Sequence, residues 1–395
     1  MRILVAPDKF KGSLTALEAA QAMERGIRRV LPNARVVMVP LADGGEGTVE
    51  AMVNVPGGQT INITVTGPLG NAVRSKFGLI GPSVISQMGL GAKGTGMFSG
   101  IIEMALASGL ALVPPDKRNP MITTTYGTGE LIRAALHENC MKIIIGIGGS
   151  ATTDGGMGMA QALGVTFFDP NGMELGLGSG QYLSQVAEID ITGLDKGARE
   201  ATIIIASDVR NPLSGPDGAA VIYGPQKGAT PEMVKRLDEG MAHYASVIKK
   251  QLGVDVDDVP GAGAAGGLGA GLMAFLGAEM RSGVEVIMDA VWFDHKLTDV
   301  DLVLTGEGNI DAQTVFGKVV AGVARRSKAK GIPVIAIGGG VTPEAEPLLA
   351  IGVKEMHQFV TPGMSFEFAV DNAAVLLEDK TAEVVSRFIQ DTSQK

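Results

Sequence analysis

The chain has 395 residues, of which 19% are charged and 45% hydrophobic, and its formal net charge at neutral pH is −9. The length predicts two domains, and the composition is that of a folded, soluble protein. The acidic balance argues against nucleic acid as a partner, because phosphate backbones require a basic face. It does not exclude a small anionic substrate, since a few local lysines in an acidic protein can bind one.

Three features predict a cytoplasmic protein. The single cysteine, Cys140, cannot form an intrachain disulfide, which fits a reducing compartment. The apolar run before Asp8 and Lys9 is too short for a signal peptide. The uncharged stretch 260–278 is mostly glycine and alanine in its first half, so it predicts a glycine loop entering a buried helix rather than a membrane span. We expect no membrane association, and a homodimer is a possible state of assembly.

Short runs of β-branched residues alternate with helical patterns along the chain, which predicts a parallel sheet covered by helices. Five strands, each followed by a helical segment, are expected at residues 2–6, 34–40, 301–306, 332–340 and 354–360. They would form a flavodoxin-like (Rossmann-like) sheet in the order 2-1-3-4-5. The helix after the first strand is expected to begin with a capping box between Thr15 and Glu18.

The middle of the chain has a different pattern. Residues 60–81 alternate with a period of two about a Gly-Pro-Leu-Gly-Asn turn, which predicts an antiparallel hairpin. Two more buried strands are expected at 141–149 and 201–209. Residues 82–100 are rich in glycine and have no clear period, so they predict a flexible excursion. We therefore expect two α/β domains with the active site in the cleft between them: a discontinuous flavodoxin-like domain, 1–58 and 284–395, and an inserted α/β domain, 59–283.

Glycine occurs 56 times, about twice its usual share of roughly 7%. It clusters with polar residues just after strands or at helix starts, the edge where open α/β sheets bind ligands. In PDKFKGS, Lys9 and Lys11 stand beside a helix start and could hold a carboxylate or phosphate, although a solvated loop is the alternative. In ADGGEGT, Asp43 and Glu46 could accept substrate hydroxyls, hold a hydrated Mg²⁺, or cap the following helix.

Two hydroxyl-rich stretches, ITTTYGTGE at 122–130 and IGGSATTDGG at 147–156, are typical of loops that hold nucleotide phosphates. The candidates for phosphate contact in them are Thr128, Gly148, Gly149, Ser150 and Thr152. Asp154 would repel a bare phosphate, but it could meet a Mg²⁺-bound phosphate or a substrate hydroxyl. The alternative for Thr128 and Asp154 is helix capping, which is worth only about 1 kcal/mol.

Four further residues could carry chemistry. Asp208 ends a buried strand, where an acid without a partner is expensive. Lys227 lies between two glycines and could reach a phosphate as a point charge. Glu307 and Asp311 follow another strand at a spacing that suits a metal or a general base, although acids at a helix start also favour the helix dipole. 

The sequence also carries one misleading pattern. GAGAAG fits the GxGxxG fingerprint, but it follows the acidic stretch VDVDDVP instead of a strand, which argues against NAD. Its Gly263 and Gly266 could still approach a nucleotide closely. No GxxxxGK[ST] motif occurs, and the four histidines lack metal-ligand spacing. The glycine-hydroxyl loops, strand-end carboxylates and few lysines together suit phosphoryl transfer.

Several longer motifs resemble the type-1 bacterial glycerate kinases, namely VAPDKFKGSLTALEAA, PLADGGEGTVEAM, VTGPLG, IGIGGSATTDGGMGMAQALG, NPLSGPDGAA, YGPQKGA, VPGAGAAGGLGAGLMAFLGA and LTGEGNIDAQT. The similarity covers nearly the whole chain. It implies two α/β domains and the phosphorylation of glycerate with ATP and Mg²⁺. Members linked to glyoxylate, glucarate or galactarate breakdown are taken to make 2-phosphoglycerate. Two features depart from the family: Asn309 stands where it usually has arginine, and roughly fifteen extra residues precede IIEMALASGLALVPP.

We therefore expect an ATP-dependent glycerate kinase in which Lys9, Asp208 and Asp311 act in catalysis. Asp208 and Glu307 are the expected Mg²⁺ ligands. The expected substrate-binding residues are Lys11, Asp43, Glu46 and Asp154. Lys227, Gly263 and Gly266 join the phosphate candidates named above. One alternative, an NAD-dependent hydroxy-acid dehydrogenase, depends on GAGAAG alone. The other, a non-catalytic two-domain binding protein for small acids, does not explain several phosphate-type loops.

Overall fold

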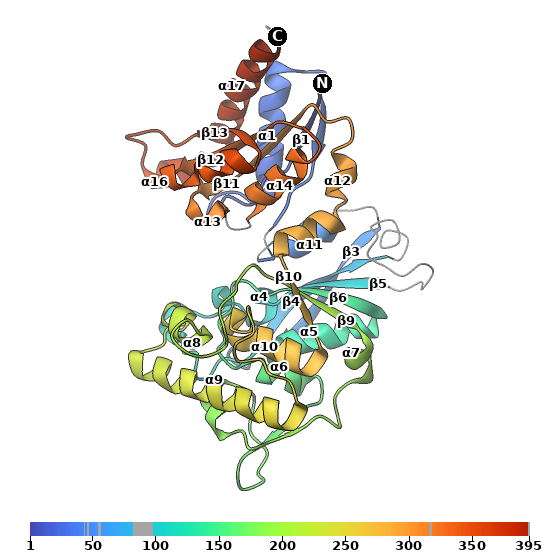
Figure 1. Ribbon diagram of the computed structural model, residues 1–395, viewed down its shortest axis with the longest axis vertical. Helices are drawn as coiled ribbons and strands as arrows, with labels where there is room; N and C mark the ends of the chain where they lie inside the picture. The colour runs from blue at the N-terminus through green and yellow to red at the C-terminus, as the bar shows by residue number, and fades with distance from the viewer. Residues whose placement is uncertain (43, 46, 54–56, 82–97, 316–317, 394–395) are drawn as a thin grey trace. The chain divides into compact units, whose positions relative to one another are not determined.

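The structure is a computed structural model that describes residues 1–395 with the exception of 43, 46, 54–56, 82–97, 316–317 and 394–395. The chain divides into two units: unit 1 is Met1–Asp43 with Val284–Lys395, and unit 2 is Gly44–Gly283 (Figure 1). Each has its own sheet with helices packed on it, so the expected α/β fold class is confirmed. The expected domain bounds stay a prediction, and residues 44–58 group with unit 2 in this division.

Unit 1 contains a five-stranded sheet in which every pairing is parallel. Its strands are β1 (Arg2–Val5), β2 (Arg35–Met38), β11 (Leu302–Ile310), β12 (Val334–Val341) and β13 (Val353–Gln358). They are ordered β13-β12-β11-β1-β2. Numbered by their place within this sheet, that is the order 2-1-3-4-5, as expected from the sequence.

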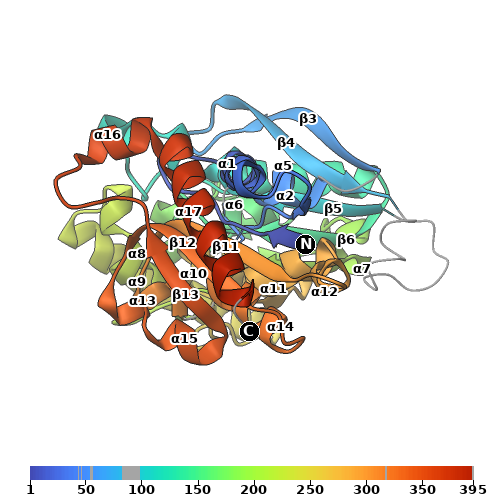
Figure 2. The same cartoon turned by 90° about the horizontal axis from the view of Figure 1, so that it is seen from above.

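Helices cover both faces of this sheet. The helices of unit 1 are α1 (Ala16–Val30), α11 (Gly283–Ala290), α12 (Phe293–Lys296), α13 (Ala312–Val315), α14 (Val319–Lys328), α15 (Pro347–Ile351), α16 (Phe366–Asp371) and α17 (Ala373–Ser393), of which α1, α14, α15 and α17 pack on the sheet. Because side chains alternate along a strand, Ile335 and Ile337 of β12 pack with α1 and α17, whereas Ala336 packs with α14 and α15. Helices α1 and α17 lie side by side (Figure 2). The capping box of Thr15 and Glu18 is confirmed at the start of α1.

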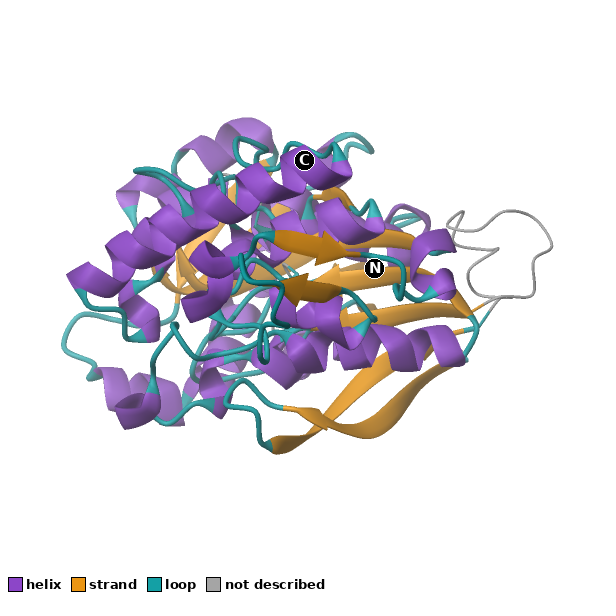
Figure 3. Cartoon of the chain, turned by 90° about the horizontal axis from the view of Figure 1, so that it is seen from below, coloured by secondary structure: helices purple, strands orange, loops and turns teal. Residues whose placement is uncertain are grey.

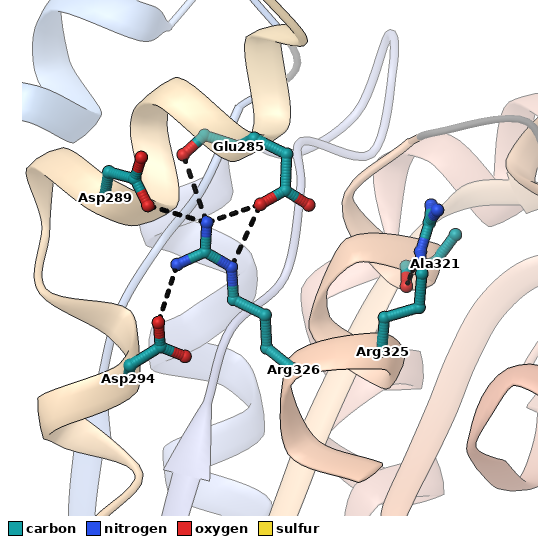
Figure 4. Close-up of polar contacts among 6 residues, drawn as sticks. All are labelled: Glu285, Asp289, Asp294, Ala321, Arg325 and Arg326. Atoms are coloured by element: carbon teal, nitrogen blue, oxygen red, sulfur yellow. Dashed lines mark hydrogen bonds and ion pairs between the residues drawn. The ribbon is translucent and has the colours of Figure 1, made fainter. Parts of the chain in front are cut away.

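A mostly buried arginine joins three helices of unit 1 (Figure 4). Arg326 of α14 donates to the carboxylates of Glu285 and Asp289 on α11, the latter at 2.7 Å, and to Asp294 on α12 at 3.0 Å. Its neighbour Arg325 donates instead to the Ala321 carbonyl of its own helix. Planar guanidinium groups suit several carboxylates at once, so Arg326 fastens α11 and α12 to α14.

Unit 2 is built on a six-stranded mixed sheet in the order β10-β9-β6-β5-β4-β3. The strands are β3 (Gly58–Thr66), β4 (Ala72–Ile80), β5 (Phe98–Glu103), β6 (Cys140–Gly146), β9 (Thr202–Ala206) and β10 (Glu279–Arg281). β3 and β4 form the expected antiparallel hairpin, and β5, β6, β9 and β10 are parallel. A separate ribbon pairs β7 (Thr166–Phe168) with β8 (Glu188–Asp190).

One segment differs from the sequence-based expectation. Residues 82–97 of the expected excursion lie outside the described residues, but Phe98–Gly100 begin strand β5. Ser99 and Gly100 interrupt the apolar pattern there, so the start of this strand could not be predicted from the sequence. Their place in the sheet comes from pairing with Lys142 and Ile143 of β6.

Helices pack over the strands of unit 2 (Figure 3). They are α2 (Thr48–Val53), α4 (Ala105–Ser108), α5 (Tyr126–His137), α6 (Met157–Ala162), α7 (Lys196–Glu200), α8 (Ala219–Tyr223), α9 (Pro231–Leu252) and α10 (Ala264–Leu276). As expected, the stretch 260–278 is a glycine turn that enters a buried helix, α10. Among the helices that the structure describes, none is long and apolar enough to span a membrane.

Candidate active site

The carboxyl ends of the four parallel strands of unit 2 form one row. Glu103 of β5 is paired with Gly146 of β6, which is paired with Ala206 of β9, and Ala206 is paired with Arg281 of β10. The polar stretches found in the sequence follow this row: the 147–156 loop comes after β6 and Asp208 after β9. Such an edge is where open α/β sheets bind ligands, so this row of strand ends is the candidate ligand-binding edge of unit 2.

A second loop packs directly on this row of strand ends. A Cβ at Gly146 would lie 2.4 Å from the carbonyl oxygen of Gly44, and a Cβ at Gly44 would lie 2.5 Å from that of Ala206. Glycine is therefore required on both sides for the backbones to approach. This loop belongs to the ADGGEGT motif, whose two candidate residues, Asp43 and Glu46, lie outside the described residues.

Glu103 is a site residue that the sequence analysis missed. It is 4% exposed, and its carboxylate accepts the N–H of Val49 at 2.6 Å and that of Gly47. Burial raises the pKa of Glu103, while the two amide donors act in the opposite direction. Its carboxylate fixes the start of α2 and the loop before it. The available signal was an acid ending an apolar run, FSGIIE, where a lone charge is expensive.

The exposed part of the IGGSATTDGG loop is short. Gly148 and Gly149 are exposed, and Ser150 is 9% exposed. Gly149 has a φ of +76°, which favours glycine. Hydrogen bonds fix the turn on both sides, from the Leu110 amide to the Gly149 carbonyl at 2.8 Å and from the Ala151 amide to the Ser108 carbonyl at 2.9 Å. Gly148 and Gly149 are thus the phosphate candidates of this loop that are accessible to a ligand.

Two of the hydroxyl candidates for phosphate contact are fully buried. Thr152 has no exposed surface. Thr128 lies inside α5, and its hydroxyl is hydrogen-bonded to that of Ser108 at 2.9 Å. These positions favour packing over contact with a ligand, because a phosphate group cannot reach a hydroxyl in the interior. Tertiary contacts of this kind are not visible in the sequence.

Asp154 is also completely buried, and its carboxylate joins two helix starts. It accepts the amide and hydroxyl of Thr125 at 2.8 and 2.7 Å, and the amides of Gly156 and Gly158 at 3.2 and 3.3 Å. Burial raises the pKa of Asp154, and these four donors act against that rise. The contacts favour the alternative in which Asp154 serves helix amides. Its contact with substrate stays a prediction.

Three further nucleotide candidates lie in the interior of unit 2. Lys227 is 2% exposed, and its ammonium donates to the Thr152 carbonyl at 2.6 Å. Gly263 and Gly266 of GAGAAG approach protein backbone, since Cβ atoms there would lie 2.1 Å from the Pro212 carbonyl oxygen and 1.9 Å from that of Thr152. GAGAAG leads into α10 without a strand directly before it, as expected. The geometry thus gives all three residues partners within the protein.

Asp208 is exposed, two residues beyond the end of β9. The neighbouring amide of Ser207 donates to the carbonyl of Arg281 at 3.1 Å, which extends the β9–β10 pairing to the start of this loop. The strand end therefore delivers an accessible carboxylate to the same edge as Gly148 and Gly149. This placement is compatible with the expected roles in catalysis and in Mg²⁺ binding.

Unit 1 has its own polar cluster at the carboxyl end of its sheet. In the loop that follows β1, Lys9 is half-buried and Lys11 exposed, while Asp8 is 4% exposed and accepts the Lys9 amide at 2.7 Å. This loop lies against β11, because a Cβ at Gly308 would be 3.1 Å from the main-chain nitrogen of Lys11. Lys9 and Lys11, the two candidates from the PDKFKGS motif, thus lie near the carboxyl end of β11.

The end of β11 adds two carboxylates, Glu307 within the strand and Asp311 directly after it. Glu307 is 6% exposed, accepts the Thr314 hydroxyl at 2.6 Å and lies 3.6 Å from the ammonium of Lys318. Asp311 is half-buried and accepts the Gln313 amide at 2.8 Å and the side-chain amide of Asn309 at 3.0 Å. Asn309 therefore supplies a neutral donor beside Asp311, where the resemblance led us to expect a cationic arginine.

In the described part of the chain, no three His, Cys, Asp or Glu side chains come together as a candidate metal site. Mg²⁺ in phosphoryl-transfer enzymes is commonly held by one or two carboxylates together with substrate phosphates. An accessible carboxylate such as Asp208 fits that donor set. Glu307 fits it less well, since it is mostly buried and already has Thr314 and Lys318 as partners.

Residues 3–390 match the model of the Glycerate kinase family. The chain belongs to this family. It is 50% identical over 357 residues to the glycerate 2-kinase of Escherichia coli K12, covering 90% of this chain and 88% of that protein. It is 47% identical over 386 residues to the glycerate kinase of Bacillus subtilis 168, covering 98% and 97%.

A solved structure agrees with these relatives. A protein described as glycerate kinase 2 from Salmonella typhimurium LT2 is 46% identical, and its crystal structure matches all of both chains with a TM-score of 0.85. The resemblance stated from the motifs is therefore confirmed. Membership of the glycerate kinase family also excludes the NAD-dependent dehydrogenase, the alternative that depended on GAGAAG alone.

Proposed function

We propose that this chain transfers the γ-phosphoryl group of ATP to the 2-hydroxyl of D-glycerate, giving 2-phosphoglycerate and ADP. The observation that carries the proposal is family membership over residues 3–390, with a relative named glycerate 2-kinase at 50% identity. The geometry supports it, because an exposed glycine turn and an accessible carboxylate occupy one sheet edge, and lysines and carboxylates occupy another.

Gly148 and Gly149 would bind nucleotide phosphate through their main-chain N–H groups, which carry partial positive charge and add no side-chain bulk. Lys9 and Lys11 would bind the carboxylate of glycerate or a phosphate group as point charges. In the reaction the bond from the γ-phosphorus to the bridging oxygen of ADP breaks, and a bond forms to the glycerate oxygen. The hydroxyl proton passes to a carboxylate, for which Asp208 and Asp311 are the candidates.

Mg²⁺ is the expected metal, and when bound it would neutralise charge on the phosphate oxygens. Asp208 would hold it, with Glu307 as the second candidate ligand. The side chains Asp43 and Glu46 stay candidates for substrate hydroxyls. This role rests on their motif, in which Gly44, one of the two glycines between them, packs against Ala206.

The test is to incubate the protein with ATP, Mg²⁺ and D-glycerate, follow ADP release, and identify the product by phosphorus NMR. We expect glycerate-dependent ADP release and the resonance of 2-phosphoglycerate. ADP release no faster than in a control without glycerate would overturn the kinase proposal. A resonance of 3-phosphoglycerate would keep the kinase and correct the position of transfer.

A further inference from the structure

Two buried donors hold successive carbonyl groups of the IGGSATTDGG loop from the inside of unit 2. The hydroxyl of Thr123 donates to the Ala151 carbonyl at 2.9 Å, and the ammonium of Lys227 donates to the Thr152 carbonyl at 2.6 Å. Thr123 is 1% exposed and Lys227 2% exposed. Both donors are far from these carbonyls in sequence, so the loop is fixed by tertiary contacts.

The C-terminal part of the loop is fixed from the same interior by Asp154, which binds the amides of Gly156 and Gly158. Lys227 and Asp154 carry opposite charges, and the field of Asp154 acts to keep Lys227 protonated against the cost of burial. Buried charges persist when they are hydrogen-bonded and have an opposite charge nearby. The interior thus holds the loop through a buried lysine and a buried aspartate, each hydrogen-bonded to the main chain.

These contacts have a consequence at the surface. The peptide unit is planar, so fixing the carbonyl of one residue also fixes the N–H of the next on the opposite side. The carbonyls of Ala151 and Thr152 are held inward, and the amide of Ala151 donates to the Ser108 carbonyl at 2.9 Å, so the segment that directly follows Ser150 is fixed on both sides. The exposed turn at Gly148 and Gly149 is joined to this segment by Ser150, a single residue. The backbone contacts with Ser108 and Leu110 hold the turn directly, and the buried donors Thr123 and Lys227 hold the segment into which it leads.

We propose that Lys227 and Thr123 are positioning residues that set the exposed Gly148–Gly149 turn for nucleotide phosphate, without contacting the nucleotide. This assigns Lys227 a different role from the direct phosphate contact expected from the sequence. The proposal rests on the proposed function, since it assumes that the turn binds phosphate of ATP.

The experiment compares Lys227→Met and Thr123→Val with wild type. Lys249→Met and Thr202→Val are the matched controls, because Lys249 is an exposed lysine paired with Asp255 and Thr202 is an exposed threonine of β9. Losing a hydrogen bond from a charged donor costs enough free energy for about a tenfold effect or more. We expect KM for MgATP to rise about tenfold in Lys227→Met and about threefold in Thr123→Val. KM for glycerate should change less than about twofold, and the controls should match wild type.

Hydrogen–deuterium exchange of the peptide covering 147–156 gives a second readout that needs no activity. Without ligand, we expect faster exchange there in both variants than in wild type, with the peptide of β11 unchanged. Wild-type exchange and wild-type KM for MgATP in folded Lys227→Met and Thr123→Val would overturn the proposal. If Lys227→Met does not fold, Thr123→Val, which only replaces a hydroxyl by a methyl, decides by the same criteria.

The two readouts separate the failure of this inference from failure of the proposed function. If wild type has no glycerate kinase activity, exchange with and without MgATP still shows whether the 147–156 peptide is protected by nucleotide. Exchange of this peptide could be faster in the variants while MgATP gives no protection in wild type. Thr123 and Lys227 would then stabilise the loop, but the loop would not bind nucleotide phosphate. That outcome overturns the proposal as stated.

Discussion

The carboxylate of Glu103, the last residue of β5, accepts a hydrogen bond from the amide of Val49 at 2.6 Å and so lies at the start of α2. The first amides of a helix have no partner within the helix and attract an anion. In this unit the protein supplies that anion itself. Because the loop before α2 packs on Gly146 and Ala206, Glu103 holds it in place over two strand ends.

Replacing Glu103 by glutamine should lower the free energy of unfolding by about 1–3 kcal/mol, because the new side-chain NH₂ faces an amide donor. Urea unfolding followed by circular dichroism measures this change. Glu50→Gln is the control, since Glu50 is 64% exposed and pairs with Lys76 at the surface; it should change stability by less than about 0.5 kcal/mol. Equal stability of the two variants would show that Glu103 does not hold α2.

Asp208→Asn and Asp311→Asn should each lower kcat about 100-fold or more, because a missing proton acceptor or metal ligand slows the chemical step. Their melting temperatures should stay close to that of wild type, since Asp208 is exposed and Asp311 is only half-buried. Asp258→Asn serves as the control, because Asp258 is an exposed acid of unit 2. Wild-type turnover in either site variant would exclude that carboxylate as base or metal ligand.

The sequence predicted the strand order of unit 1 because each β-branched run is followed by a clear helical pattern, and this combination has few solutions. It also found the glycine turn at Gly148 and Gly149, because backbone cradles need residues of that kind. It could not tell which polar residues of that motif face outward. Thr152, Asp154 and Lys227 are enclosed by segments far away in the sequence, and a polar residue at a helix start has the same pattern whether it meets a ligand or an amide.

Gly266 illustrates the same limit and gives a third prediction. Its GxGxxG pattern suggests a ligand, yet a Cβ there would lie 1.9 Å from the Thr152 carbonyl oxygen, and its φ is +69°. Gly253 has a similar φ of +74°, but a Cβ there would meet nothing within 4 Å. Gly253→Ala should cost about 1 kcal/mol from backbone strain alone. Gly266→Ala should lower the free energy of unfolding, measured with urea, several-fold more than Gly253→Ala does. Equal losses in the two variants would show that close packing does not require glycine at position 266.

Lys227 gives a prediction about pH, because burial lowers its pKa from 10.5 to about 7 although the charge of Asp154 raises it. Between about pH 7 and 10.5 the unfolded chain carries a proton on Lys227 that the folded chain has released. Stability rises with pH wherever the unfolded state binds more protons, here by up to about 1.4 kcal/mol per pH unit. The stability of wild type relative to Lys227→Met should therefore increase from pH 7 to 9.5 and be flat below pH 6.

Urea unfolding of both proteins across this range measures that difference, in which most contributions from other groups cancel. Lys249→Met is the control, because the hydrogen bond to Asp255 raises the pKa of Lys249 above its ordinary value. Lys249 then keeps its proton in both states up to pH 9.5, so the difference between wild type and Lys249→Met should not change with pH. A flat difference for Lys227→Met as well would mean that Lys227 stays charged in the fold. Lys227 would then support the loop as a cation throughout this pH range.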